Sequence, residues 1–184
     1  MDAVDRALAK LELAALALAC TALFAVMVLV FLDAVLRYAF TNPLTWVSDI
    51  TTLYLLSAIM FLGLGYTLRH AGHIAIDLFA LMMPRRLYQG IIGVGLLCTD
   101  FMIGIMTYRI SSLSRMSWIN NETMIGIYAW PVWLGKAIVA ASLFILLLRT
   151  LHVGLANLAA SLSGDSTIAI PITPGPTEPA EDSI

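Results

Sequence analysis

Long apolar stretches follow one another along the chain, separated by short polar segments. Four of them are long enough to span a membrane: Leu13–Leu32, Ile50–Leu68, Leu87–Tyr108 and Trp130–Leu148. Charged residues interrupt them twice, at Asp100 in the third stretch and at Lys136 in the fourth. A helix needs ~20 apolar residues to cross a hydrocarbon core of ~30 Å, and no stretch shows the two-residue alternation of a membrane β-strand. The pattern predicts an all-α integral membrane protein with four transmembrane helices in a bundle.

The chain divides into three parts around these stretches. A transmembrane domain is expected over residues 13–151, with short interfacial segments between spans at about 13–36, 50–68, 87–108 and 130–148. We expect residues 1–12 to form an amphipathic segment on the cytoplasmic surface. Residues 152–184 are predicted to be a cytoplasmic tail that is disordered from about residue 163, because prolines alternate there with small polar residues.

Basic residues near the ends of the spans predict the orientation, because cytoplasmic connections carry an excess of Lys and Arg. Six of them fall on the side of both termini: Arg6, Lys10, Arg69, Arg85, Arg86 and Arg149. Three fall on the opposite side: Arg37, Arg109 and Arg115. Both termini are therefore expected in the cytoplasm. All four tryptophans fall on the opposite side, where indole rings suit the headgroup boundary.

Composition narrows the range of functions. The chain is 60% apolar and 12% charged, whereas soluble domains are about 45–50% apolar and about 25% charged. A net charge of −2 offers no basic face for a nucleic acid. Cys20 and Cys98 lack the spacing of metal ligands, and no hydrolase, nucleotide-binding or metalloprotease motif is present. We therefore expect no catalytic residue, no cofactor and no nucleic-acid partner.

Charged side chains inside a bilayer are costly and are often functional. From the expected ends of the third and fourth spans, Asp100 lies ~12 Å and Lys136 ~9 Å below the same surface, at ~1.5 Å per residue. We therefore expect an ion pair between Asp100 and Lys136 that joins the two helices. Two alternatives remain open: Asp100 is protonated and bonded to Thr99 or Ser142, or Asp100 pairs with a partner subunit.

Two further polar groups have structural interpretations. Asp33 and Arg37 are four residues apart, which predicts an ion pair along one helix face, with a ligand-binding arginine as the alternative. His70 and His73 lie in a predicted connection, and His152 lies at the end of the fourth span. Haem iron held by two histidines needs imidazoles that face each other within the bundle, so these positions disfavour a haem site.

Two local strings resemble a known family. Residues Arg37–Asp49 have the sequence RYAFTNPLTWVSD and join the first two spans. Gly63–Tyr66 has the sequence GLGY, and Gly72–Asp77 follows with GHIAID, before Pro84. These strings, the length and the four spans resemble the small membrane (Q-type) subunit of the tripartite ATP-independent periplasmic (TRAP) transporters, over roughly residues 13–151.

The resemblance implies a non-catalytic subunit of a secondary, ion-coupled importer in a bacterial inner membrane, with sodium as the coupling ion. In such systems a periplasmic binding protein captures the solute and a large membrane subunit moves it. The small subunit supports the large one in the bilayer and helps to dock the binding protein. The expected partners are therefore the large TRAP membrane subunit, the periplasmic solute-binding protein and the lipid bilayer.

The resemblance also implies roles for single residues. In the outer connection, four residues would organise the loop and face the binding protein: Arg37, Tyr38, Trp46 and Asp49. A tight inner turn would be formed by Gly72, His73 and Asp77. In that turn Gly72 supplies backbone freedom and Asp77 caps the following segment.

Two functions of other classes remain open beside this interpretation. A self-sufficient four-helix exporter needs a carboxylate within the membrane, a role that Asp100 could fill. A haem-binding membrane redox anchor is the other alternative, which the histidine positions disfavour.

Overall fold

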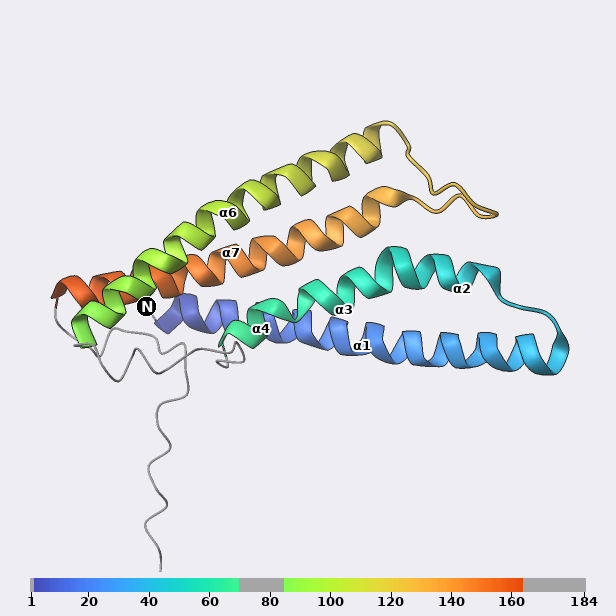
Figure 1. Ribbon diagram of the computed structural model, residues 1–184, viewed down its shortest axis with the longest axis horizontal. Coiled ribbons are helices and arrows are strands. Elements are labelled where there is room, and N and C mark those ends of the chain that lie inside the picture. The colour runs from blue at the N-terminus through green and yellow to red at the C-terminus, as the bar shows by residue number, and fades with distance from the viewer. Residues whose placement is uncertain (1, 70–84, 164–184) are drawn as a thin grey trace, which may run out of the picture.

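The computed structural model describes residues 2–69 and 85–163 (Figure 1). Its helices, in chain order, are α1 (Asp2–Phe40), α2 (Thr45–Ile50), the π-helix η1 (Thr51–Leu55), α3 (Leu56–Leu62), α4 (Leu64–Arg69), α6 (Arg85–Ile119) and α7 (Val132–Ser163). Within the described residues, four helical stretches are long and apolar enough to cross a membrane: Asp5–Phe40, Thr45–Leu68, Leu87–Ile119 and Val132–Ser163. The predicted all-α membrane fold with four spans is confirmed.

The first span is one continuous helix. α1 runs from Asp2 to Phe40, so residues 2–12 form the first turns of the spanning helix itself. Its 39 residues extend ~58 Å at ~1.5 Å per residue, about twice the ~30 Å of the hydrocarbon core. In this first part of α1, Leu8 and Glu12 are buried among neighbouring helices. Residues 2–12 therefore continue the first spanning helix, and Glu12 contacts α4 and α7.

The second span is interrupted, and α7 approaches it closely at the interruption. The π-helix η1 separates α2 from α3, and the carbonyl of Leu53 in η1 lies against Gly135 of α7. A Cβ atom on Gly135 would lie 2.5 Å from that carbonyl oxygen. Glycine at position 135 therefore permits a backbone contact that no other residue allows. π-helical turns are often found at functional sites.

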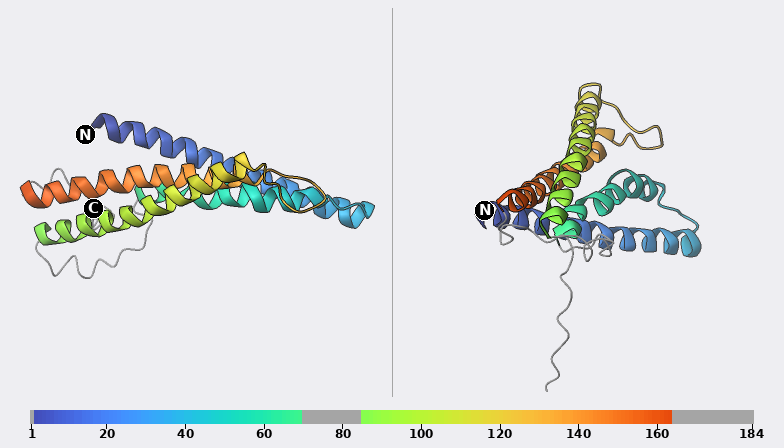
Figure 2. Two further views of the ribbon diagram at one scale, coloured as in Figure 1. Left: turned by 90° about the horizontal axis from the view of Figure 1, so that it is seen from above. Right: turned by 60° about the vertical axis from the view of Figure 1, so that its left-hand side comes forward.

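The third and fourth spans form an antiparallel pair. A Cβ atom on Gly93 of α6 would lie 2.9 Å from the backbone nitrogen of Leu158 in α7, so the two helices cross closely near the start of α6 and the end of α7. α7 also contacts α1, α3, α4 and η1, and it is therefore the central helix of the described structure. Figure 1 and the right view of Figure 2 show α6 diverging from α1 toward the segment 120–131, while α7 stays beside the second span.

Residues 120–131 form a hairpin between α6 and α7. The backbone N–H of Met124 donates to the carbonyl of Trp130 at 2.8 Å, and Val132 N–H donates to Glu122 at 3.1 Å. Asn121 turns the chain after α6 with a positive φ of 48°. We call this end of the molecule the hairpin end, and the end where α1 begins and α7 finishes the termini end.

Candidate functional site

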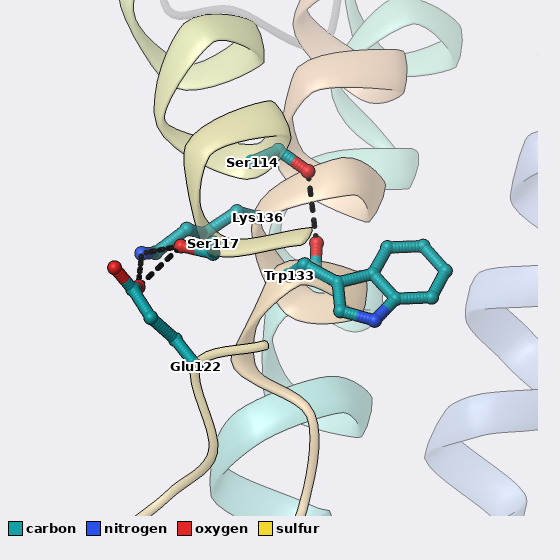
Figure 3. A network of polar contacts seen from close by, with 5 residues as sticks. All are labelled: Ser114, Ser117, Glu122, Trp133 and Lys136. Carbon is teal, nitrogen blue, oxygen red and sulfur yellow. Dashed lines mark hydrogen bonds and ion pairs between the residues drawn. The ribbon is translucent and has the colours of Figure 1, made fainter. Parts of the chain in front are cut away.

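A polar cluster ties the hairpin to the ends of α6 and α7 (Figure 3). Lys136 Nζ donates to Ser117 Oγ at 2.6 Å, and the Ser117 hydroxyl donates to Glu122 Oε2 at 2.6 Å. Lys136 also forms an ion pair with Glu122 at 3.4 Å. Ser117 is almost fully buried, whereas the charged groups reach solvent. The three side chains, from α6, the hairpin and α7, therefore form one hydrogen-bonded cluster, which we call the hairpin latch.

The hairpin latch favours the ionised form of Glu122. The hydrogen bond from Ser117 is the main cause that lowers the pKa of this carboxyl below its ordinary value of 4.5. Asn120 and the charge of Lys136 act in the same direction, and desolvation opposes them. The latch is therefore formed with a carboxylate at neutral pH.

The second span also holds the hairpin. Tyr54 in η1 donates its hydroxyl hydrogen bond to the carbonyl of Pro131 at 2.7 Å. On the other strand of the hairpin, Gly126 lies against the carboxylate of Asp49, within 3.8 Å of where its Cβ would be. Asp49, a residue singled out from the sequence, therefore lies beside the hairpin, and the two connections at this end form one surface.

Asp33 organises the connection between α1 and α2. Its carboxylate accepts a hydrogen bond from Arg37 at 2.6 Å, which confirms the predicted ion pair. The other carboxylate oxygen accepts the backbone N–H of Leu44 at 2.7 Å. Asp33 therefore fixes both the arginine and the loop that leads into α2. Tyr38 projects from this end of α1 and is highly exposed, and Trp46 is half-buried at the start of α2.

The expected ion pair between Asp100 and Lys136 is wrong. Asp100 is 6% exposed, and its Oδ1 accepts a hydrogen bond from the hydroxyl of Thr150 in α7. Lys136 instead belongs to the hairpin latch with Ser117 and Glu122. The two charges lie at different depths because α6 continues past Tyr108 to Ile119. Asp100 is thus ~28 Å from the end of α6, and Lys136 is ~6 Å from the start of α7.

The two hydroxyl groups predicted as alternative partners of Asp100 form hydrogen bonds with other groups. Thr99 donates to the carbonyl of Gly95 at 2.9 Å, and Ser142 donates to the carbonyl of Ile138 at 2.7 Å. Serine and threonine in a helix often satisfy the carbonyl four residues earlier in this way. The second oxygen of Asp100 is buried and has no hydrogen-bond partner among the described residues. Asp100 therefore interacts with α7 through Thr150.

A buried ionic cluster joins α1 to α7 at the termini end. Arg149, 3% exposed, pairs with Asp5 at 2.5 Å and with Glu12 at 3.4 Å. Glu12 is fully buried, and its side chain packs against Gly65 of α4. We call these three residues the termini cluster. Charge counting places Arg149 on the cytoplasmic side, but it does not show that two acids on α1 surround it.

The family of the chain follows from a comparison with family models. Residues 26–160 match the model of the DctQ component of the tripartite ATP-independent periplasmic transporters. The match covers most of the chain and all four spans in whole or in part. The chain belongs to this family. It is a multi-pass membrane protein and a transporter component, and the resemblance stated from the sequence is confirmed.

Members of the DctQ family work in a tripartite complex with a large membrane component and a periplasmic binding component. No curated protein and no solved structure shows significant similarity to this DctQ component. Gly72, His73 and Asp77, expected to form the inner turn, lie outside the described residues. Among residues 2–69 and 85–163, no group of three His, Cys, Asp or Glu side chains is placed to hold a metal ion.

Proposed function

We propose that this DctQ component is the non-catalytic small subunit of a sodium-coupled TRAP importer in a bacterial inner membrane, with both termini in the cytoplasm. It supports the large transport subunit in the bilayer and helps to dock the periplasmic binding protein. The family match over residues 26–160 carries this proposal. Solute and sodium sites belong to the large subunit, so we assign none to this chain.

Uncovered apolar surface supports a scaffold role. Long apolar side chains on α1 are exposed in the isolated chain, among them Phe24, Met27 and Phe31. On α6 the same holds for Phe101 and Met102. In a bilayer such surfaces face either lipid or another membrane protein. A subunit with two exposed helix faces has room for a large partner and for lipid together.

The connections at the hairpin end support a docking role. Arg37, Tyr38, Trp46 and Asp49 lie at this end, and Asp49 adjoins the hairpin. The hairpin exposes Ile125 and Ile127 almost completely, although it is held by the hairpin latch. Apolar groups held on a fixed loop are suited to contact a protein partner. We assign this combined surface to the binding protein.

Purification of the chain with a tag at its C-terminus, in mild detergent, tests the proposed assembly. We expect a much larger membrane protein to co-purify in a stoichiometric amount. A homodimer with no larger partner would contradict the scaffold role and would favour a small exporter that uses Asp100. Substitution of Ile125 and Ile127 by serine then tests docking: it should weaken binding of the periplasmic protein and leave co-purification of the large subunit unchanged.

The inner turn is tested separately. Alanine at His73 and at Asp77 should lower expression or co-purification of the large subunit, because the family motif places both in a tight turn. Normal expression and normal co-purification of both variants would remove the assignment. Sodium coupling is tested with the complete transporter in vesicles, where replacing sodium by potassium outside should abolish solute uptake.

A further inference from the structure

A groove of about 350 Å³ lies on the surface of the α6–α7 pair near the hairpin end. Its lining includes Ser111, Arg115, Trp118, Trp133, Ala137 and Ala140, all from α6 and α7. The small side chains of Ala137 and Ala140 leave room along α7, and the rings of Trp118 and Trp133 meet edge to face at 4.3 Å. Counted from the helix ends, the two tryptophans and Arg115 lie nearer the hairpin (the upper part), and Ser111, Ala137 and Ala140 lie deeper in the span (the lower part).

The residue types in the upper part of the groove, an arginine and two tryptophans near the helix ends, suit the depth of lipid headgroups. Arg115 is four residues from the end of α6 at Ile119, a distance of ~6 Å along the helix. Trp133 is in the first turn of α7, and tryptophans concentrate at the membrane interface. From there Ala137 and Ala140 continue toward the middle of the span. A lipid with its headgroup at Arg115 would thus have its acyl chain along α7.

Arg115 is an exposed cation of α6. Lys136 pairs with Glu122, Arg37 with Asp33, and Arg149 with two acids. Among the described residues, no carboxylate forms an ion pair with Arg115. The Ser114 hydroxyl is occupied by the Trp133 carbonyl at 3.0 Å, which fixes one wall of the groove (Figure 3). The guanidinium of Arg115 remains for an anionic ligand.

We propose that this groove binds one anionic phospholipid, whose phosphate is held by Arg115 and whose acyl chain extends past Ala137 to Ala140. A guanidinium pairs with a phosphate through two parallel hydrogen bonds, which suits this headgroup chemistry. The positive charge at the level of the tryptophans selects an anionic lipid over a zwitterionic one.

Native mass spectrometry of the full chain tests the proposal. The purified chain is mixed with equal amounts of phosphatidylglycerol and phosphatidylcholine, and the lipid that stays bound is counted. We expect about five-fold preference for phosphatidylglycerol, since one basic residue near a membrane surface contributes about 1 kcal/mol. Arg115→Gln should abolish the preference. Arg109→Gln is the matched control, because Arg109 is an exposed arginine of α6 that does not line the groove, and it should keep it.

A second variant tests the lower part of the groove. Ala137→Leu fills the proposed acyl position without a change of charge and should reduce retention of both lipids, with the helical circular dichroism unchanged. The proposal is overturned if Arg115→Gln keeps the preference, if both arginine variants lose it equally, or if wild type binds the two lipids alike. It is also overturned if the assembled transporter releases the lipid, because a protein subunit would then occupy the groove. The test on the chain alone is independent of the proposed transporter function.

Discussion

The two ends of the molecule use the same chemistry in different surroundings. In the hairpin latch, Lys136 is 30% exposed and lies 3.4 Å from Glu122, which is 45% exposed. In the termini cluster, Arg149 is 3% exposed and lies 3.4 Å from Glu12, which is fully buried. The distances are equal, but water screens the first pair and is excluded from the second. Burial, and not the distance between the charges, therefore decides how much the loss of each pair changes the free energy of unfolding.

The difference has consequences for assembly. A buried charge without its partner is costly, so the termini cluster fixes the position of α1 against α7. The hairpin latch is exposed, so its loss leaves charges that water can solvate. The contacts at the termini end are therefore the costlier ones to break, and those at the hairpin end are held by charges that water can solvate.

The largest effect is expected from Arg149→Met. It leaves Glu12 and Asp5 without their cation, and breaking a buried pair in this way costs about 3–5 kcal/mol. Thermal unfolding of the purified chain in detergent measures the loss. Adding Glu12→Leu to Arg149→Met should recover part of the stability, because the unpaired acid is then removed. If Arg149→Met were no worse than Arg109→Met, the comparison between the two ends would fail.

A smaller effect is expected from Gly135→Ala near the hairpin end. The new Cβ atom would lie 2.5 Å from the Leu53 carbonyl, so α7 and η1 must move apart. Forced overpacking of this kind costs about 1–3 kcal/mol. Gly95→Ala is the matched control, because its Cβ meets nothing within 4 Å, and alanine favours a helix interior by about 1 kcal/mol. Equal unfolding temperatures of the two variants would show that backbone contact does not hold this end together.

The sequence predicts the spans but not their register. Apolar stretches of sufficient length determine that four helices cross the membrane. The end of α6 depends instead on local turn geometry at Asn121, beyond a stretch with several serines and arginines that is still helical. Hydropathy places this end too early, at Tyr108, and the depth of Asp100 relative to Lys136 is then wrong. An ion pair between two helices can be predicted only if the relative depth of their residues is known, and composition does not contain this information.

In the candidate site, contacts within one helix are likewise predictable from the sequence, and contacts between helices are not. The ion pair of Asp33 with Arg37 is confirmed because a spacing of four residues fixes the geometry within one helix. The contacts of Arg149 with Asp5 and Glu12 join residues far apart in sequence. A signal for them exists: Asp5, Leu8 and Glu12 recur at helical spacing, so two acids share a face with an apolar residue. Nothing in that pattern names the partner helix.

Asp100 lies between the two ends, and its substitution is expected to cause a smaller loss of stability than that of Arg149. Asp100→Leu leaves Thr150 without this partner and should cost about 1–2 kcal/mol, whereas Asp100→Asn keeps a hydrogen bond to the hydroxyl and should cost less. Double-variant cycles measured by thermal unfolding separate the possible partners. Asp100→Leu should be non-additive with Thr150→Val and additive with Lys136→Met, because Lys136 is not in contact with Asp100. The opposite result would restore the ion pair with Lys136.

The smallest effect is a dependence of the hairpin latch on pH. The folded-state pKa of Glu122 is lowered, mainly by the Ser117 hydrogen bond, so the carboxylate stabilises the folded chain above the ordinary pKa of 4.5. That stabilisation is lost as the pH falls through the lowered value, where Glu122 becomes protonated. The unfolding temperature of wild type should therefore exceed that of Glu122→Gln at neutral pH, and the two should converge in acid.

Salt should reduce this difference in unfolding temperature at neutral pH, because the latch is exposed. At the termini end, salt should change the gap between wild type and Arg149→Met less, since Arg149 and Glu12 are buried and only Asp5, 39% exposed, reaches water. A latch as insensitive to salt as the termini cluster would mean that burial does not distinguish the two ends.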